Sequence, residues 1–164
     1  RARLAGIRGP LAQLRVRYDP NPNCFDTCAP GCFARPVIAG GPDNRTFALG
    51  GVGDGAVLRV EHRVQGDDVN PYLAVAAMLA GGVYGIREML PLEPAFVGNA
   101  YASDKPRVPS TLLEARDLFA ASTVAEQVFG KDVVEHYVHA ADIELQAFNT
   151  AVTDWERVSG FERL

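Results

Sequence analysis

The residues of this chain best suited to chemistry are two arginines that flank a carboxylate: Arg59, Glu61 and Arg63. Apolar and polar residues alternate along 56–64 (AVLRVEHRV), a pattern typical of a β-strand. Side chains two positions apart lie on the same face of a strand, so the three charges should form a row. His62 and its apolar neighbours should project from the opposite face.

A helix is predicted directly after this strand. Asn70 suits the N-cap and Pro71 the first helical position, and residues 70–86 (NPYLAVAAMLAGGVYGI) are almost wholly apolar. A helix that is apolar all round is expected to be buried. The strand leading into it should then lie near the core, where charges are costly unless they are paired or bind a charged ligand.

The strand is expected to pair with the segment before it, so that residues 44–64 form an antiparallel hairpin with a turn centred on Asp54. This register places Arg45 opposite Arg63. Like charges directly opposite destabilise a hairpin by up to ~1 kcal/mol. An anion bound between the two guanidinium groups would reverse that effect. The alternative is an exposed face on which the arginines and Glu61 form their own salt bridges, and the spacing leaves both interpretations open.

Two different segments precede the hairpin. Five arginines in residues 1–20 predict a solvated basic helix rather than a nucleic-acid or phosphate-binding arm. Residues 20–43 are rich in proline and glycine and predict a long loop. The three cysteines of this loop (Cys24, Cys28, Cys32) do not have zinc-site spacing, so a metal site is not expected there.

Two further helices are predicted after residue 110. Thr111 and Glu114 have the spacing of a capping box, which predicts a helix from there to about Ser122. Beyond Gly130, an apolar stripe predicts a long helix from Lys131 to about Thr153. On this last helix His136 and His139 are expected to be surface residues. The tail that follows mixes aromatic and charged residues and is expected to dock on a neighbour.

The length of the chain predicts a single domain, and the pattern of predicted elements predicts an α+β fold. Its antiparallel sheet is built on the 44–64 hairpin and backed by helices. The chain has 164 residues, 48% of them hydrophobic, and a net charge of −4. A nucleic-acid-binding protein normally carries a basic excess, so that class is not expected. No uninterrupted apolar run reaches the ~18 residues of a membrane span, and no secretory signal is visible. The cytoplasm is therefore the expected location.

Six segments resemble, in order, the C-terminal part of the catalytic domain of glutamine synthetase-type ligases. They are DNRT (43–46), RVEHR (59–63), NPYLAVAAMLAGGVYGI (70–86), GNAY (98–101), VPSTLLEA (108–115) and VTDWERVSGFERL (152–164). The tail is most similar to the branch that includes gamma-glutamylpolyamine synthetases. The resemblance implies a ligase that joins glutamate to ammonia or a polyamine. In this family ATP first phosphorylates the gamma-carboxylate, and the amine then displaces phosphate.

The resemblance also implies roles for the row of charges. Glu61 matches a glutamate that ligates Mg²⁺ or Mn²⁺, and Arg63 matches an arginine beside the gamma-carboxylate and the transferring phosphoryl group. Arg59 matches a contact to the ATP phosphates, and Arg45 matches a contact to the substrate glutamate. These roles agree with the chemistry, since phosphoryl transfer depends mostly on positioning and on charge neutralisation.

Some positions depart from the family pattern. Gly50 stands where an ATP-contacting arginine is usual, Thr27 where a substrate-binding arginine is expected, and Gly40 where an aromatic residue often lies near the nucleotide. The resemblance further implies that residues 1–164 lack the family's N-terminal β-domain and the first part of the catalytic domain, with most metal ligands. We therefore expect the chain to be inactive alone and the complete protein to be a homo-oligomer. The alternative is a non-catalytic remnant that binds anions or supports oligomerisation.

Overall fold

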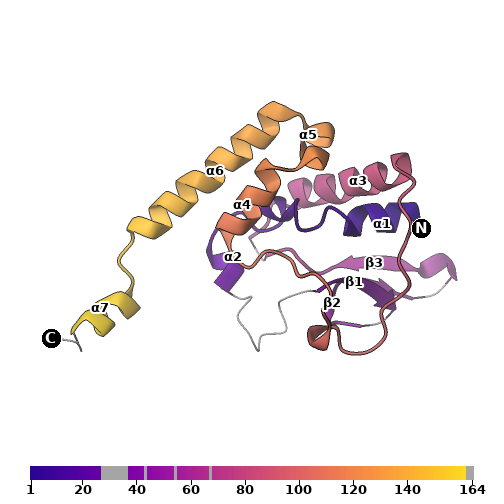
Figure 1. Cartoon of the computed structure of the whole chain (residues 1–164), viewed down its shortest axis with the longest axis horizontal. Helices are drawn as coiled ribbons and strands as arrows, with labels where there is room; N and C mark the ends of the chain where they lie inside the picture. Colours follow the sequence, from indigo (N-terminus) through magenta and orange to yellow (C-terminus); the bar gives the residue numbers. More distant parts are fainter. Residues whose placement is uncertain (27–36, 43, 54, 67, 162–164) are drawn as a thin grey trace.

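The computed structural model describes residues 1–164 except 27–36, 43, 54, 67 and 162–164. The fold is α+β, as predicted, with a small sheet backed by helices (Figure 1). The strands, in the order β1-β2-β3 across the sheet, are β1 (Val37–Pro42), β2 (Phe47–Val52) and β3 (Arg59–His62). The α-helices are α1 (Ala2–Arg8), α2 (Asn23–Asp26), α3 (Pro71–Arg87), α4 (Leu112–Ala120), α5 (Thr123–Phe129), α6 (Lys131–Thr150) and α7 (Asp154–Phe161). Short 3₁₀ turns are η1 (Arg15–Arg17), η2 (Gly55–Val57) and η3 (Ala100–Ala102).

The predicted hairpin is confirmed as the antiparallel pair β2–β3, but the predicted register is wrong. Gly50 lies opposite Glu61, and the backbone N–H of Arg63 donates to the carbonyl of Ala48 at 2.9 Å. Arg63 therefore lies opposite Ala48 instead of Arg45, a shift of three residues. The cause is the connection between the strands, which contains the helical turn η2 and is longer than a tight turn around Asp54 would be.

Strand β1 was not predicted, because it lies within the segment 20–43 that the sequence analysis assigned to a loop. It pairs in parallel with β2. Its other edge is covered by the connection after α3, since Ile38 donates to the carbonyl of Pro106 at 2.7 Å and Phe96 donates to that of Gly40 at 3.0 Å. The Gly-Gly-Pro ending of β1 lacks the alternation of a half-buried strand, which explains the missed assignment.

Helices α1 and α3 lie side by side over the sheet and approach each other backbone to backbone (Figure 1). A Cβ atom added at Gly6 would lie 2.1 Å from the carbonyl oxygen of Gly81, and one at Gly85 would lie 2.4 Å from the Cα of Gly6. Only glycine permits this approach. The predicted start of α3 is confirmed, with the Asn70 side chain accepting hydrogen bonds from the first turn.

The prediction that α3 is buried all round is wrong. Its buried positions are small residues, of which the three glycines approach α1: Ala74, Ala77, Ala80, Gly81, Gly82 and Gly85. Larger apolar residues on the remaining surface, such as Leu79, are exposed. The reason is that the described residues supply neighbours for only part of the helix surface.

The prediction of a solvated basic helix at the N-terminus is also wrong, because Arg8, Arg15 and Arg17 are buried. The guanidinium carbon of Arg17 lies 3.8 Å from the ring centre of Tyr137 and 5.1 Å from that of Phe129. Cations over desolvated aromatic faces are stabilised by the ring quadrupole. Arg17 therefore fastens the N-terminal segment to the C-terminal helices.

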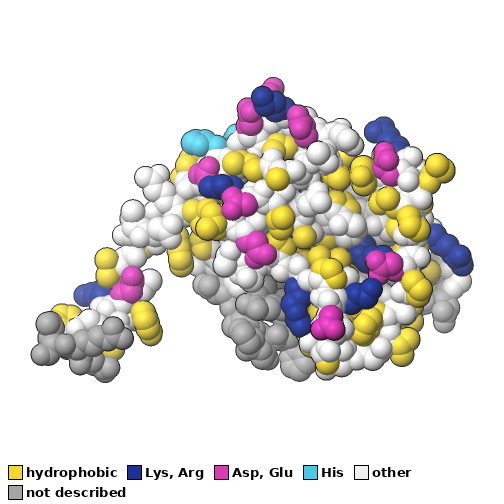
Figure 2. Space-filling model, in the orientation of Figure 1, with side chains coloured by type: hydrophobic (Ala, Val, Ile, Leu, Met, Phe, Trp, Pro, Cys, Tyr) yellow, Lys and Arg dark blue, Asp and Glu magenta, His cyan; other side chains and the backbone are white. Residues whose placement is uncertain are grey.

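The predictions for the C-terminal helices are confirmed in part. Thr111 accepts the N–H of Glu114 at 3.1 Å, which confirms the N-cap of α4. Gly130 (φ +83°) confirms the break before α6. Helix α5 was not predicted as a separate element. None of the described residues of α7 is buried, and this helix projects from the rest of the molecule (Figures 1 and 2). The docking of this tail on a neighbour stays a prediction.

Candidate active-site face

The candidate site is the charged row on β3. The Nη1 of Arg63 lies 3.2 Å from Oε1 of Glu61, and their side chains are 23% and 48% exposed. The structure therefore brings Glu61 and Arg63 together and leaves them accessible. The expected position near the core is not observed, because β3 forms an edge of the sheet among the described strands, and the exposed ion pair agrees with the alternative of a salt-bridged face.

Arg59 is exposed at the start of β3 and lines a cleft of about 230 Å³. The glycine pairs Gly40-Gly41 and Gly50-Gly51 contribute to the same cleft. Most of the exposed surface of this cleft is apolar, and Leu4, Leu49 and Leu58 are among its lining residues. A larger cleft of about 510 Å³ is lined by residues of α4 and α6, including Arg116 and Asp142, and none of the four candidate residues lines it.

Arg45 is exposed in the turn before β2 and, given the register, does not lie opposite Arg63. Its neighbours have a clear structural role. Asn44 accepts the backbone N–H of Thr46 at 2.9 Å and donates to the carbonyl of Gly98 at 2.8 Å. The hydroxyl of Thr46 accepts the N–H of Ala100 at 3.0 Å. The DNRT and GNAY segments therefore contact each other, although more than 50 residues separate them in the sequence.

Behind the charged row, His62 anchors β3 to the core. Its ring centre lies 4.5 Å from that of Tyr18. Both ring nitrogens are buried, and the Gln65 side chain interacts with the imidazole. Burial lowers the pKa of His62, so the imidazole is neutral at pH 7. Because successive side chains alternate across a strand, this anchor turns Glu61 and Arg63 toward the opposite face.

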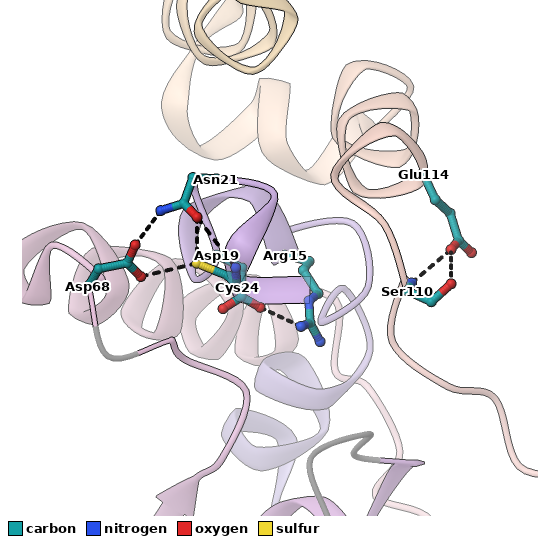
Figure 3. Close-up of polar contacts among 7 residues, drawn as sticks. All are labelled: Arg15, Asp19, Asn21, Cys24, Asp68, Ser110 and Glu114. Atoms are coloured by element: carbon teal, nitrogen blue, oxygen red, sulfur yellow. Dashed lines mark hydrogen bonds and ion pairs between the residues drawn. The ribbon is translucent and has the colours of Figure 1, made fainter. Parts of the chain in front are cut away.

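Arg15 and Asp19 form a buried ion pair (Figure 3). The Nη2 of Arg15 lies 2.6 Å from Oδ2 of Asp19, and the Arg15 guanidinium also lies 4.9 Å from the ring centre of Phe25. Burial raises the pKa of Asp19 to about 7, although the Arg15 charge acts to lower it. Sequence reasoning missed this pair. The signal that was available is the i,i+4 spacing of an arginine and an aspartate.

The link between β3 and α3 is tied to the same region. Cys24 donates its S–H to Oδ1 of Asp68 at 3.0 Å, and the amide of Asn21 donates to the other oxygen of that carboxylate (Figure 3). A Cβ added at Gly66 would lie 3.0 Å from Oδ1 of both Asp19 and Asp68. Burial raises the pKa of Cys24 to about 12, so its thiol stays protonated and is a poor ligand or nucleophile. Cys28 and Cys32 lie outside the described residues.

The described residues do not by themselves fit a complete metal site. Glu61 can supply one carboxylate, whereas Mg²⁺ prefers about six oxygen ligands in near-octahedral geometry. No group of three or more His, Cys, Asp or Glu side chains among the described residues is placed to hold a metal ion. His136 and His139 are exposed on α6, as predicted.

Two of the departures from the family pattern, Gly50 and Gly40, lie among the described residues, whereas Thr27 lies outside them. A Cβ added at Gly50 would lie 3.6 Å from Oε2 of Glu61, which is an ordinary contact distance. A Cβ at Gly40 would lie 3.4 Å from the carbonyl oxygen of Leu49. Neither glycine is therefore required by a close backbone approach, and a side chain at position 50 would begin beside the Glu61 carboxylate.

Among the described residues, no helix has both the length and the apolar character needed to cross a bilayer.

The glutamine synthetase catalytic-domain family matches residues 1–159. The chain is 48% identical over 161 residues to the gamma-glutamylethanolamide synthetase of Streptomyces coelicolor, covering 98% of this chain and 35% of that protein. It is 30% identical over 154 residues to the gamma-glutamylputrescine synthetase of Escherichia coli, covering 93% and 33%.

A solved structure of GmaS in complex with ADP superposes with a TM-score of 0.82 at 25% identity. The match covers 98% of this chain and 39% of that chain. The chain therefore spans about a third of the length of the curated relatives that it matches.

Proposed function

The chain belongs to the glutamine synthetase family, and we propose that it forms part of an ATP-dependent ligase that makes gamma-glutamyl amides. Residues 1–164 would correspond to the C-terminal part of the catalytic domain. The substrates would be glutamate, ATP and either ammonia or an amine. Support comes from relatives named as synthetases of gamma-glutamylethanolamide, gamma-glutamylputrescine and glutamine.

The observation that carries the proposal is the accessible pair of Glu61 and Arg63 on β3. Phosphorylation of a carboxylate gathers negative charge on the phosphoryl oxygens, and a guanidinium fork can neutralise this charge while fixing its geometry. Arg63 would serve the gamma-carboxylate and the transferring phosphoryl group, and Arg59 would contact the ATP phosphates. Arg45 would bind the substrate glutamate, and Glu61 would supply one ligand of Mg²⁺ or Mn²⁺.

The same residues indicate why more polypeptide is needed. Three arginines and one carboxylate can neutralise phosphate, but they cannot complete the coordination of a divalent ion. About two thirds of the Streptomyces coelicolor relative lies outside the matched region. We infer that this remainder supplies the other ligands, that residues 1–164 alone are inactive, and that the complete protein is a homo-oligomer.

The complete protein should be assayed with MgATP, glutamate and, in separate reactions, ammonia, ethanolamine, putrescine and isopropylamine. We expect amine-dependent release of phosphate together with the matching gamma-glutamyl amide, detected by mass spectrometry. Ethanolamine is the first amine to test, because the gamma-glutamylethanolamide synthetase is 48% identical to this chain. Absence of every amide from a folded protein that binds ATP would refute the ligase proposal.

Gly50 favours a second candidate, a non-catalytic protein that binds anions or supports oligomerisation. It lies directly opposite Glu61 and contributes no positive charge there. Under this alternative, the protein would bind ATP without amine-dependent phosphate release. The Gly50→Arg variant would then tighten ATP binding but yield no amide.

A further inference from the structure

Tyr18 contacts the chain on both sides of Arg63. Its ring centre lies 4.5 Å from that of His62, the residue before Arg63. Its backbone carbonyl accepts the N–H of Gly66, which follows a short way after Arg63, at 3.3 Å. Tyr18 is only 1% exposed, so it makes both contacts from within the core. One buried residue therefore fixes both ends of the segment that carries the Arg63 guanidinium.

Arg63 depends on these contacts more than the other charges of the row do. The other two lie within β3 and are paired with β2. Arg63 follows the last residue of β3, and its N–H donates to the carbonyl of Ala48 at 2.9 Å. The next residue, Val64, is buried in the same apolar cluster as Tyr18. The direction of the chain at Arg63 is therefore set as much by the core around Tyr18 as by the sheet.

The link that follows Arg63 is closely packed against the segment that begins at Tyr18. A Cβ atom added at Gly66 would lie 3.0 Å from Oδ1 of Asp19 and 3.1 Å from Sγ of Cys24. These distances are shorter than ordinary van der Waals contacts, and close-packed interiors transmit displacements to their neighbours. A change of packing at Tyr18 should therefore move the link, and with it the end of β3.

We propose that Tyr18 is a positioning residue for Arg63. Tyr18 is buried and does not touch substrate, but it holds residues 62–66 so that the guanidinium meets the gamma-carboxylate and the transferring phosphoryl group. Rates depend steeply on such placement, since a displacement of about 1 Å can cost about 100-fold in rate. A guanidinium also binds an anion through a fork of fixed geometry, so its direction matters as well as its distance. This inference rests on the proposed ligase reaction and adds to it a residue from behind the site.

The test is a double-mutant cycle on turnover in the complete protein, with Tyr18→Leu and Arg63→Ala as the two changes. Tyr18→Leu should lower kcat by about 10–100-fold. The KM for ATP should change by less than about 3-fold, because Arg59, the proposed contact to ATP, lies within the paired part of β3. In the Arg63→Ala background, Tyr18→Leu should have no further effect on kcat, since a positioning residue acts only through the group that it positions. Equal effects in the two backgrounds would overturn the proposal.

Matched controls separate positioning from folding. Tyr18→Phe keeps the ring against His62 and should retain the wild-type kcat. Phe119→Leu alters an equally buried aromatic residue of α4, and its kcat should match the wild type once the rate is divided by the folded fraction from urea denaturation. If Tyr18→Leu does not fold, His62→Leu removes the same ring contact from the side of β3, and the same cycle is expected for it.

Hydrogen–deuterium exchange supplies a readout that needs no turnover. In Tyr18→Leu the amides of residues 62–66 should exchange about 10-fold faster than in the wild type, because the contacts that hold this segment are weakened. In Phe119→Leu their exchange should be unchanged. Unchanged exchange of residues 62–66 in Tyr18→Leu would overturn the proposal, whether or not the protein forms an amide. A failure of the ligase proposal appears in the wild-type assay instead, so the two failures are distinguishable.

Discussion

Two groups of arginines in this chain have opposite environments. Arg15 and Arg17, near the N-terminus, are buried against a carboxylate and aromatic rings. Arg59 and Arg63, on β3, lie at an edge of the sheet, where Glu61 is the one ion-pair partner among the described residues. The sequence predicted a solvated N-terminal group, which is wrong, and left both a ligand-binding row near the core and an exposed salt-bridged face open for the β3 group. The difference shows that an arginine-rich segment can form core while charges beside an apolar helix stay accessible.

The two groups therefore have different consequences for stability and for function. A buried guanidinium that has its partners in place contributes to the fold, and removing one partner is costly. An exposed guanidinium contributes little to the fold and can bind an anion. The comparison predicts that changes at the N-terminal group alter the free energy of unfolding, whereas changes at the β3 group alter activity.

The largest effect is expected for Asp19→Ala, which removes the carboxylate that faces Arg15 in the core. At pH 8, where Asp19 is mostly ionised, the free energy of unfolding should fall by about 3–5 kcal/mol, because the buried Arg15 guanidinium loses the carboxylate that lies 2.6 Å away. Urea denaturation of the 164-residue chain measures this change. The matched control is Asp117→Ala, which removes an exposed partner of Arg116 and should cost less than about 1 kcal/mol. Equal losses in the two variants would contradict the comparison.

Next in size is the effect of Arg63→Ala on the complete protein. Turnover should fall by about 10²–10³-fold, since a group that stabilises transition-state charge is lost. The free energy of unfolding should change by less than about 1 kcal/mol, because the side chain is partly exposed and its partner Glu61 is half exposed, so that solvent screens the ion pair. Lys131→Ala, at another exposed ion pair, is the control and should leave turnover unchanged. If the variant is destabilised enough to account for its loss of activity, Arg63 contributes to folding and not to turnover.

The structure shows which parts of the fold could be predicted from the sequence. Local signals were read correctly: Asn70 and Thr111 cap helices, and the β2–β3 hairpin is present. The burial of Arg17 could not be predicted, because Tyr137 lies 120 residues further along the chain. Strand β1 was missed because its pairing with β2 and with the 88–111 connection, and not its own alternation, makes it a strand.

The candidate site was predicted only in part for the same reason. The spacing of Glu61 and Arg63 on one strand is local, and the structure brings them together. The position of Arg45 depended on the length of the β2–β3 connection, which the helical turn η2 extends. The anchor behind the row, His62 on Tyr18, joins residues 44 positions apart and carried no local signal.

A third prediction concerns pH. Burial raises the pKa of Asp19 to about 7, from about 3.9 in an unfolded chain, so the folded state holds this proton more tightly. The stability contributed by the protonated group is full below about pH 4 and is lost as the pH rises to about 7. Arg15 and Asp68 are the charged groups that act on it, in opposite directions.

Urea denaturation of the wild-type chain and of Asp19→Asn between pH 4 and pH 8 separates this group from the other carboxylates. The stability advantage of the wild type over the variant should decrease with rising pH and level off above about pH 7. Each unit of pKa difference corresponds to about 1.4 kcal/mol, so a decrease of more than 1 kcal/mol is expected. An advantage that grows with pH would mean that Arg15 keeps Asp19 ionised.

The smallest effect is expected for Glu61→Gln in the isolated chain. This change removes the ion pair between Glu61 and Arg63 on β3. Its ion pair with Arg63 measures 3.2 Å, but the carboxylate is half exposed and solvent screens the attraction. The free energy of unfolding should change by less than about 0.5 kcal/mol, and the change should shrink further between 0.1 and 0.5 M salt. A loss above about 1 kcal/mol that persists in high salt would make the row a structural ion pair. A negligible loss would agree with a role of Glu61 in ligand binding, since the fold would gain nothing from its ion pair with Arg63.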